Sequence, residues 1–381
     1  MKILVIRRDN IGDLVLTTPL LASLRRAYPA AHIAALVNTY NQAVLAHCPD
    51  IDALHVYEKA KHLPGSKLAI WWRTLKLVLA LKRQRFDVVI LAGNGYSRQA
   101  AKFARLVGAR KIVGYAPAHG AHVLDHVVTA DPARHHHAEV THRLLGALGI
   151  DSAPGAACVL PAPAEAAAAR QALAGLSGSG MVIGVHISAR KPQQRWPAEA
   201  FVALMQALHA RLACRFMLFW SPGDEDHPAH PGDDRKAARI VAAAAQYGLP
   251  LLPYPTGELP QLIGGLAVCD VLLCSDGGAM HLAAGLGKPM VTFLVIPMPY
   301  TGAPGMCRTA CCSRIAGRWR TSAWPRPSRP CCHCCRKQPL AAECRPAACA
   351  AASKTLRPTL SKVGRNVLMP CPLQAGIRRS G

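Results

Sequence analysis

Residues 271–293 read VLLCSDGGAMHLAAGLGKPMVTF, which is an apolar run, a glycine turn, an alanine-rich segment and a second apolar run. The first run predicts a strand over Val271–Cys274, and the alanine-rich segment predicts a helix over Ala279–Leu286. A strand, a glycine turn, a helix and another strand form one unit of a parallel α/β sheet. The stretch therefore predicts an α/β fold built from such units.

The same alternation runs through residues 1–295 in two successive blocks. In the first block, apolar runs predict strands over Lys2–Arg7, His32–Val37, Asp87–Ala92 and Lys111–Tyr115. In the second block, they predict strands over Met181–Ile187, Arg215–Phe219, Val271–Cys274 and Met290–Val295. Runs that are apolar throughout are typical of parallel strands covered by helices on both faces.

The segment between the blocks, residues 151–180, is rich in Ala, Pro, Gly and Ser and contains one predicted helix, Ala164–Leu176. We interpret it as a linker between two Rossmann-like domains, residues 1–150 and 181–295. We expect these domains to face each other across a cleft, with ligands near the carboxyl ends of the strands. The chain shows neither an export-signal pattern nor an apolar run long enough to span a bilayer, so we expect a cytoplasmic protein.

Much of the formal net charge of +24 lies in residues 296–381. This tail contains 15 Lys and Arg against one acid, Glu343, and therefore leaves a charge of +10 for residues 1–295. It also holds 10 of the 15 cysteines and has no helical or strand periodicity. We expect an irregular tail. Its CCHCC run lacks the two-residue spacing typical of zinc sites, so we expect no bound metal.

The segment Ser275–Pro289 combines a glycine turn with a predicted helix start. Gly277 and Gly278 would let the backbone approach a ligand closely, and the free N–H groups of the helix would face a diphosphate. Asp276 would accept hydroxyl groups, and His281 would donate to a phosphate oxygen. The plain alternative is a turn with a capping aspartate, because a Gly-Gly turn alone is a weak motif.

Two further polar segments follow the first predicted strand of each block. In the first, DNIGD, Gly12 opens a turn and Asp13 stands where a helix begins, as a general base or as a helix cap. In the second, HISARKPQQRWP, three side chains could neutralise a departing diphosphate, or could belong to a solvated basic loop. These three are Ser188, Lys191 and Arg195.

These segments together resemble the ADP-heptose:lipopolysaccharide heptosyltransferases, which form glycosyltransferase family 9 with a GT-B fold. The resemblance covers residues 1 to about 295. It rests on ILVIRRDNIGDLVLTTPLLASLRRAYP at the start, RWPAEAF in the middle and SDGGAMHLAAGLGKPMVTF near the end. The chain departs from the family pattern at QQRWP, where Arg195 stands beside the tryptophan in place of the expected lysine.

The resemblance implies an inverting, metal-independent glycosyltransferase that uses no cofactor. Asp13 would be the general base, supported by Gly12, and the turn from Asp276 to His281, including Met280, would hold the nucleotide-sugar. Ser188 with a nearby cation, Lys191 or Arg195, would hold the phosphates. The implied donor is ADP-heptose and the implied acceptor is a lipid-linked glycan of the lipopolysaccharide core.

Three other classes of function compete with this interpretation, and the sequence excludes one of them. A sugar-nucleotide epimerase shares the two-domain architecture, but it would not release nucleoside diphosphate in response to an acceptor. A nucleic-acid-binding protein would explain the basic charge. Because most of that charge lies in the tail, we expect no nucleic-acid partner. A nicotinamide oxidoreductase would need G-x-G-x-x-G after the first strand, and DNIGDLVL lacks it.

The segment Lys67–Arg85, KLAIWWRTLKLVLALKRQR, alternates tryptophans and leucines with basic residues. Such a helix could lie on the anionic inner-membrane surface, where a lipid-linked acceptor would dock. The alternative is an amphipathic helix whose apolar side packs on the core and whose basic side faces solvent.

The abrupt end of the α/β pattern suggests a frameshift near Leu294–Val295 in a G+C-rich gene. Codons compatible with LVIPMPYTGAPGMCRTACC, read from the third base of the leucine codon, can encode GDSDAVHWRPWYVPHRVLQ, which resembles the continuation of the family. We predict that sequencing the gene at this point reveals such a frame. A gene with no alternative frame of this kind would refute the hypothesis.

Overall fold

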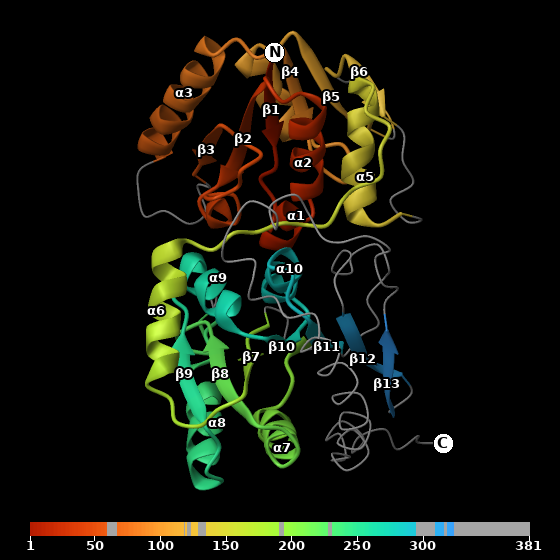
Figure 1. Ribbon diagram of the computed structural model, residues 1–381. Helices are drawn as coiled ribbons and strands as arrows, with labels where there is room; N and C mark the ends of the chain where they lie inside the picture. Colours follow the sequence, from red (N-terminus) through yellow and green to blue (C-terminus); the bar gives the residue numbers. More distant parts are fainter. Residues whose placement is uncertain are drawn as a thin grey trace, which may run out of the picture.

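The computed structural model describes residues 1–58, 67–117, 119, 123–128, 135–189, 194–227, 231–294, 309–315 and 318–323. They form two α/β lobes, one above the other in Figure 1, each built on its own sheet. The confirmed fold class is α/β, as expected from the apolar runs. The predicted Lys191 lies outside the described residues.

The first lobe contains a six-stranded parallel sheet in the order β3-β2-β1-β4-β5-β6. Its strands are β1 (Lys2–Ile6), β2 (His32–Asn38), β3 (Ala53–Tyr57), β4 (Val88–Leu91), β5 (Lys111–Tyr115) and β6 (His126–Val128). In this order the chain reverses direction across the sheet between β1 and β4. Loops at the carboxyl ends of those two strands diverge there, which makes this switch point the natural place for a ligand.

The second lobe repeats this order with β7 as its first strand. The sheet runs β13-β12-β11-β10-β7-β8-β9, and only β13 is antiparallel to its neighbour. The strands are β7 (Met181–His186), β8 (Cys214–Trp220), β9 (Leu251–Pro255), β10 (Val271–Ser275), β11 (Met290–Leu294), β12 (Thr309–Ile315) and β13 (Arg318–Ala323). The switch point lies between β7 and β10.

Helices flank the sheets in both lobes. The first lobe has α1 (Ile11–Val15), α2 (Thr18–Ala27), α3 (Lys67–Arg83), α4 (Arg98–Val107) and α5 (His137–Arg143), with short 3₁₀ turns at Gln42–Val44 and Leu144–Leu148. The second lobe has α6 (Pro163–Ala174), α7 (Ala198–His209), α8 (Asp234–Gln246), α9 (Leu259–Val268) and α10 (Gly278–Gly285). Among the described residues, no helix has the length and apolarity needed to cross a membrane.

Three apolar cores fill the spaces between sheets and helices. One lies between the first sheet and α3 with α4, and a second lies between the second sheet and α7 with α8. The third core runs from the first sheet through α1 and α10 into the second lobe, and there it includes residues of α6 and α9. This shared core holds the two lobes together, because apolar side chains of both are buried in it.

One boundary differs from the sequence expectation, because part of the expected linker over residues 151–180 packs with the second lobe. The linker helix α6 packs closely on α9, and a Cβ added at Gly264 would stand 2.7 Å from the Cβ of Glu165. We therefore group α6 with the second lobe, because its inner side chains Ala166, Ala169 and Leu173 are buried.

The tail departs from the expected irregular path at two places. The strand β12 pairs in parallel with β11, and β13 pairs antiparallel with β12. The expectation of irregular structure therefore does not hold for these two strands. The physical reason is that β11 would otherwise be an edge strand. Its unpaired N–H and C=O groups can form hydrogen bonds with another extended segment. The other residues of 296–381 lie outside the described residues.

Candidate active site

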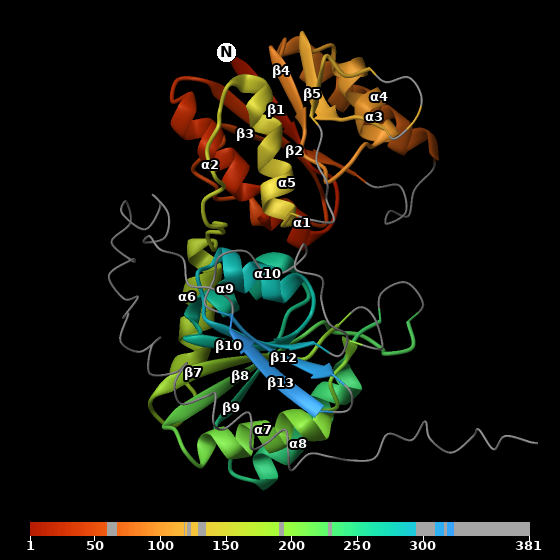
Figure 2. The ribbon, with the colours of Figure 1, turned by 90° about the vertical axis from the view of Figure 1, so that its right-hand side faces the viewer.

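The two lobes meet where α1 packs against α10, which Figures 1 and 2 both show at the junction. A Cβ added at Gly12 would stand 2.4 Å from the ring of His281, and a Cβ at Gly278 would stand 3.4 Å from Ile11. The first approach is closer than a side chain at position 12 would allow, and the second is an ordinary van der Waals distance. Because α1 follows β1 and α10 follows β10, the carboxyl ends of both sheets face this junction.

Asp13 lies in the first turn of α1, where its carboxylate is held from two sides. Arg7 donates from Nη2 to Oδ1 at 2.8 Å, and Asn10 donates to Oδ2 from its backbone N at 3.3 Å and from its Nδ2 at 3.1 Å. Burial raises the pKa of Asp13, but the charge of Arg7 and the Asn10 hydrogen bonds outweigh this effect and leave it below its ordinary value. The group is therefore an oriented carboxylate at neutral pH.

Arg7, which the sequence analysis did not single out, fixes this carboxylate. Its side chain is only 3% exposed. The guanidinium also donates to the backbone oxygen of Ala92 at the end of β4 and pairs with Asp9 at 3.2 Å. An arginine held by three oxygen groups has little freedom, so it keeps Asp13 in one orientation. A positive charge at the end of an apolar strand run is the signal that could have revealed it.

His281 lies in the first half of α10 and faces the first lobe. Its Nδ1 is enclosed and has no hydrogen-bond partner among the described residues. Burial lowers the pKa of His281 to about 4, while the charge of Asp13 raises it and those of His136 and His137 lower it. The ring is therefore neutral at pH 7, and a neutral imidazole both donates and accepts one hydrogen bond.

The glycine turn leaves an open approach to the start of α10. A Cβ at Gly277 would meet no atom within 4 Å, and the N-terminus of α10 has no side-chain cap. Asp276 accepts a hydrogen bond from the side-chain amide of Gln194. The Oγ of Ser275 is buried without a hydrogen-bond partner among the described residues. Uncapped N–H groups at the start of a helix are a ready anion site.

The segment after β7 is held by a buried acid, Asp233, which the sequence analysis did not single out. Asp233 is 1% exposed, hydrogen-bonds with Ser188, and lies 4.0 Å from Nη1 of Arg195. Ser188 also accepts from the backbone N of Ser221 at 2.9 Å, and Arg195 donates from Nε to the oxygen of Ala189 at 3.0 Å. Both predicted phosphate ligands thus have structural partners in this structure.

Lys236 completes this buried cluster. Its Nζ donates to the backbone oxygen of Ile187 at 2.8 Å and lies 5.2 Å from the ring centre of Phe201. Burial lowers the pKa of Lys236 to about 8, although Asp233 opposes that effect. Burial and the charge of Lys236 also lower the pKa of His186 to about 4. The second switch point therefore has two cations, Lys236 and Arg195, beside the buried Asp233.

An aromatic cluster supports the segment that carries Arg195. The ring of Trp196 stacks on Phe293 of β11, with centres 4.1 Å apart, and meets Phe201 of α7 edge-on at 4.8 Å. Such pairs add about 0.5–1.5 kcal/mol each beyond the area they bury. The cluster places Gln194 beside Asp276, so the β7 segment and the glycine turn form one surface.

The structure thus brings together Asp13, Gly12 and His281 at the junction, and Ser188, Arg195 and Asp276 at the switch point of the second lobe. Met280 is different, because its side chain is fully buried in the shared core. It cannot contact a ligand with that side chain, and its role in this structure is packing. The described residues contain no group of three or more His, Cys, Asp or Glu side chains arranged to hold a metal ion.

A sequence profile of glycosyltransferase family 9, the heptosyltransferases, matches residues 74–314, which is more than half of the chain. The chain belongs to glycosyltransferase family 9. The profile ends inside β12, so most of the tail lies beyond the match. Membership in this family favours a transferase over the two other classes that the sequence left open.

Curated and solved relatives agree with this assignment. Lipopolysaccharide heptosyltransferase 3 of Escherichia coli is 25% identical over 288 residues, covering 74% of this chain and 79% of that protein. A family 9 glycosyltransferase structure from Veillonella parvula has a TM-score of 0.66 at 22% identity and covers 82% of this chain and 85% of its own. The structure of Escherichia coli ADP-heptose lipopolysaccharide heptosyltransferase II has a TM-score of 0.64 at 22% identity, covering 81% and 90%. These structures establish the fold.

The close approach at Gly12 gives a test of the junction in this family 9 enzyme. The change Gly12→Ala should lower the thermal unfolding midpoint by several degrees, because the new methyl group must displace His281 or separate α1 from α10. Gly146→Ala is the matched control, since a Cβ there meets no atom within 4 Å. Equal melting of both variants in calorimetry would show that the junction is looser than the structure indicates.

Proposed function

We propose that this glycosyltransferase transfers heptose from ADP-heptose to a glycan of the lipopolysaccharide core. The names of two relatives support this proposal, since one is a lipopolysaccharide heptosyltransferase and the other an ADP-heptose enzyme. The observation that carries it is the contact of α1 with α10, which sets an oriented carboxylate beside an uncapped helix start. The carboxylate could take the proton of the acceptor hydroxyl, and the helix start could bind the leaving diphosphate.

The start of α10 would bind the donor diphosphate. Backbone N–H groups after Gly277 and Gly278 would face the phosphate oxygens, with neutral His281 donating one further hydrogen bond. Asp276 would accept a hydroxyl group of the ribose or the heptose. In the segment after β7, Ser188 with Arg195 or Lys191 would balance the remaining charge.

Asp13 would act as general base in a single displacement. The acceptor hydroxyl oxygen attacks the anomeric carbon of the heptose while the bond from that carbon to the diphosphate oxygen breaks. The proton of the hydroxyl passes to the Asp13 carboxylate, and the bonding electron pair leaves with ADP. Attack on the side opposite to the leaving group inverts the anomeric configuration. We propose a metal-independent reaction, in which the helix start and nearby cations stabilise the ADP that leaves.

We predict that Asp13→Asn lowers the rate of heptose transfer by about 10²–10⁴-fold, because the group that takes the proton is lost. The dissociation constant for ADP should stay nearly unchanged, since ADP binds to the second lobe. Transfer is measured as acceptor-dependent release of ADP, and affinity by calorimetry.

Two control variants separate the possible roles of Asp13. Asp151→Asn changes an exposed carboxylate outside the site and should leave transfer unchanged. Asn10→Ala removes the side-chain amide that donates to Asp13 but keeps the backbone N–H bond, the Arg7 contact and the carboxylate, so it should give an intermediate rate. Near-normal transfer by Asp13→Asn would eliminate the role as base and leave only the helix-capping role.

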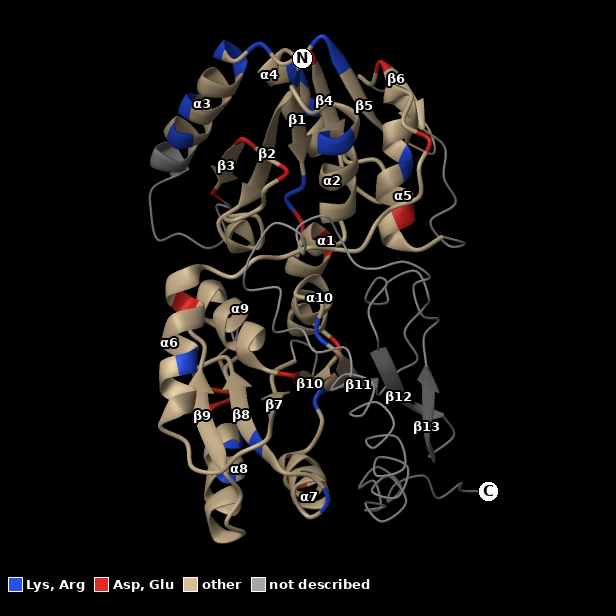
Figure 3. Ribbon diagram, viewed as in Figure 1, with Lys and Arg blue, Asp and Glu red and all other residues tan. Residues whose placement is uncertain are grey.

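We propose that α3 contacts the inner-membrane surface, where a lipid-linked acceptor would be held. Trp71 and Trp72 are 57% and 51% exposed and pack against each other edge-to-face at 5.1 Å. Basic residues lie along the same helix, which the blue segments of α3 in Figure 3 show. Exposed tryptophans beside lysines and arginines are typical of helices that bind anionic lipid surfaces.

The double change Trp71→Ala/Trp72→Ala should reduce co-sedimentation with vesicles that contain anionic phospholipid by about 10-fold or more, because large apolar surfaces no longer enter the headgroup layer. Tyr247→Ala, which removes an aromatic ring that is 54% exposed at the end of α8, should bind like the unaltered protein. Unchanged sedimentation of the double variant would rule out a membrane role for this helix.

A further inference from the structure

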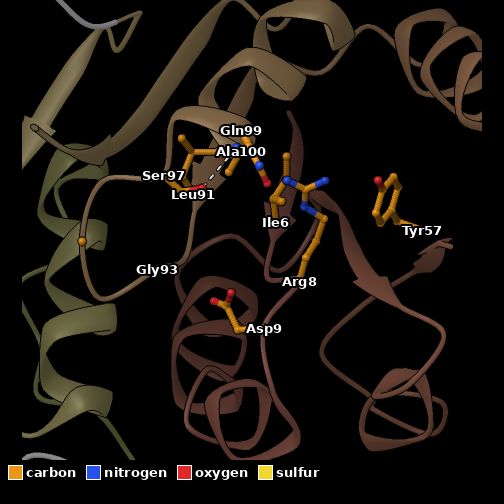
Figure 4. A pocket seen from close by; sticks show the side chains of 10 residues that line it. Ile6, Arg8, Asp9, Tyr57, Leu91, Gly93, Ser97, Gln99 and Ala100 are labelled. Carbon is orange, nitrogen blue, oxygen red and sulfur yellow. Dashed lines mark hydrogen bonds between the residues drawn. The ribbon is translucent and has the colours of Figure 1, made fainter. Parts of the chain in front are cut away.

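The two switch points are built differently. At the first, Arg8 and its neighbours line a pocket with a volume of about 340 Å³, which Figure 4 shows. At the second, a lysine lies inside the protein, against the exit of β7. Lys236 is only 7% exposed and belongs to the first turn of α8. The reaction steps proposed above do not use this lysine.

The position of Lys236 is unfavourable by itself. Burial removes water from the ammonium group, and lysines are almost never fully buried unless they are paired. A cation in the first turn of a helix also opposes the helix dipole, which favours anions at that end. Local structure therefore does not stabilise a lysine here, and partners from other segments must offset both effects.

Two oxygen groups act as these partners. Nζ of Lys236 donates to the backbone oxygen of Ile187 at 2.8 Å, and its charge acts on Asp233, the residue before α8. Asp233 is 1% exposed, and its Oδ1 has no hydrogen-bond partner among the described residues. Burial raises the pKa of Asp233, and the Ser188 hydrogen bond and the nearby cations oppose this effect. Loss of the Lys236 charge would raise the pKa of this acid further.

Asp233 connects Lys236 to the segment that would balance the donor diphosphate. Ser188 lies two residues after β7, hydrogen-bonds with Asp233, and accepts from the backbone N of Ser221 at the exit of β8. Nη1 of Arg195 lies 4.0 Å from Asp233. The charge of Lys236 therefore influences both of these proposed phosphate ligands through one buried carboxylate.

Charged and aromatic groups from several elements surround Lys236. They are Asp233 and Glu225 of the loop before α8, Arg239 of α8, Arg195 of the segment after β7, His186 of β7, and the ring of Phe201 of α7 at 5.2 Å. Burial lowers the pKa of Lys236 to about 8, with the two acids raising it and the two arginines lowering it. The arginines stay charged, and His186, whose pKa is about 4, is neutral at pH 7. Lys236 therefore changes its charge just above neutral pH.

We propose that Lys236 is a positioning residue of the donor site, whose buried ammonium holds the Ile187 carbonyl and the Asp233 carboxylate so that the segment after β7 fits the diphosphate. This role rests on the proposed function. Because ADP is an anion, its binding favours the charged form of Lys236, and binding and protonation therefore reinforce each other. The affinity for ADP falls as the pH rises through about 8.

The test measures the dissociation constant of the full chain for ADP by calorimetry between about pH 7 and about pH 9. For the unaltered protein this constant should rise by about 10-fold, within the roughly 5–150-fold that is usual for coupling between two sites. Lys236→Met keeps the length of the side chain without its charge, so it should bind ADP about 10-fold more weakly at pH 7 and show no pH dependence. Its KM for ADP-heptose should rise while kcat stays within about 2-fold, because the base Asp13 lies in the first lobe.

Three further variants make the result specific to the charge. Lys236→Arg stays charged over this range, so it should bind ADP nearly as tightly as the unaltered protein at pH 7 and show no pH dependence. Lys102→Met changes an exposed lysine of α4 and should behave like the unaltered protein at every pH. If Lys236→Met does not fold, the double change Lys236→Met/Asp233→Asn removes both buried charges, so it should fold and bind ADP without pH dependence. Thermal unfolding shows which variants are folded.

The outcomes separate this role from the proposed function. A purely structural lysine would lower the thermal unfolding midpoint of Lys236→Met but leave the ADP affinity of the folded protein and its pH dependence unchanged, which would overturn the proposal. Binding by Lys236→Arg as weak as that of Lys236→Met, or a double variant that keeps the pH dependence, would also overturn it. An unaltered protein that binds no ADP at any pH would refute the proposed donor site and this role with it.

Discussion

The close packing of α1 on α10 is the contact on which the arrangement of this enzyme depends. The contact is possible because residue 12 is glycine. The His281 ring occupies the space where a Cβ at position 12 would stand. One apolar core continues through this contact from one lobe to the other. The same few residues therefore join the lobes and carry the proposed chemistry, so stability and function are coupled at the junction.

Each lobe uses its switch point in a different way. The second lobe has a helix start without a side-chain cap and a segment braced by buried charges, which suits a diphosphate. The first lobe instead has the Arg8 guanidinium held against two aromatic rings. In both lobes the strand order is the same, so the two switch points differ through their loop residues.

The sequence predicted the glycine turn and the inner strands up to β11, but it missed the edge strands β3, β6, β9 and β13 and the inner strand β12. β1, β4, β7 and β10 are central and apolar throughout, which is a strong signal. The edge strands β3, β6 and β9 are half-exposed and mix polar residues with apolar ones, and β9 even contains two prolines, which a sheet edge tolerates. The pairing of Asp233 with Ser188 could not be predicted, because the two are far apart in sequence and meet only when β7 and α8 are placed.

In the described part of the chain, the backbone passes from one lobe to the other once, between the 3₁₀ turn at Leu144–Leu148 and α6. A single covalent crossing can act as a hinge between two lobes. Among the described residues, the contacts that oppose rotation about it are the close approach of Gly12 to the His281 ring and the shared core. The relative position of the lobes therefore depends on a contact between a bare backbone and an imidazole as well as on the peptide connection.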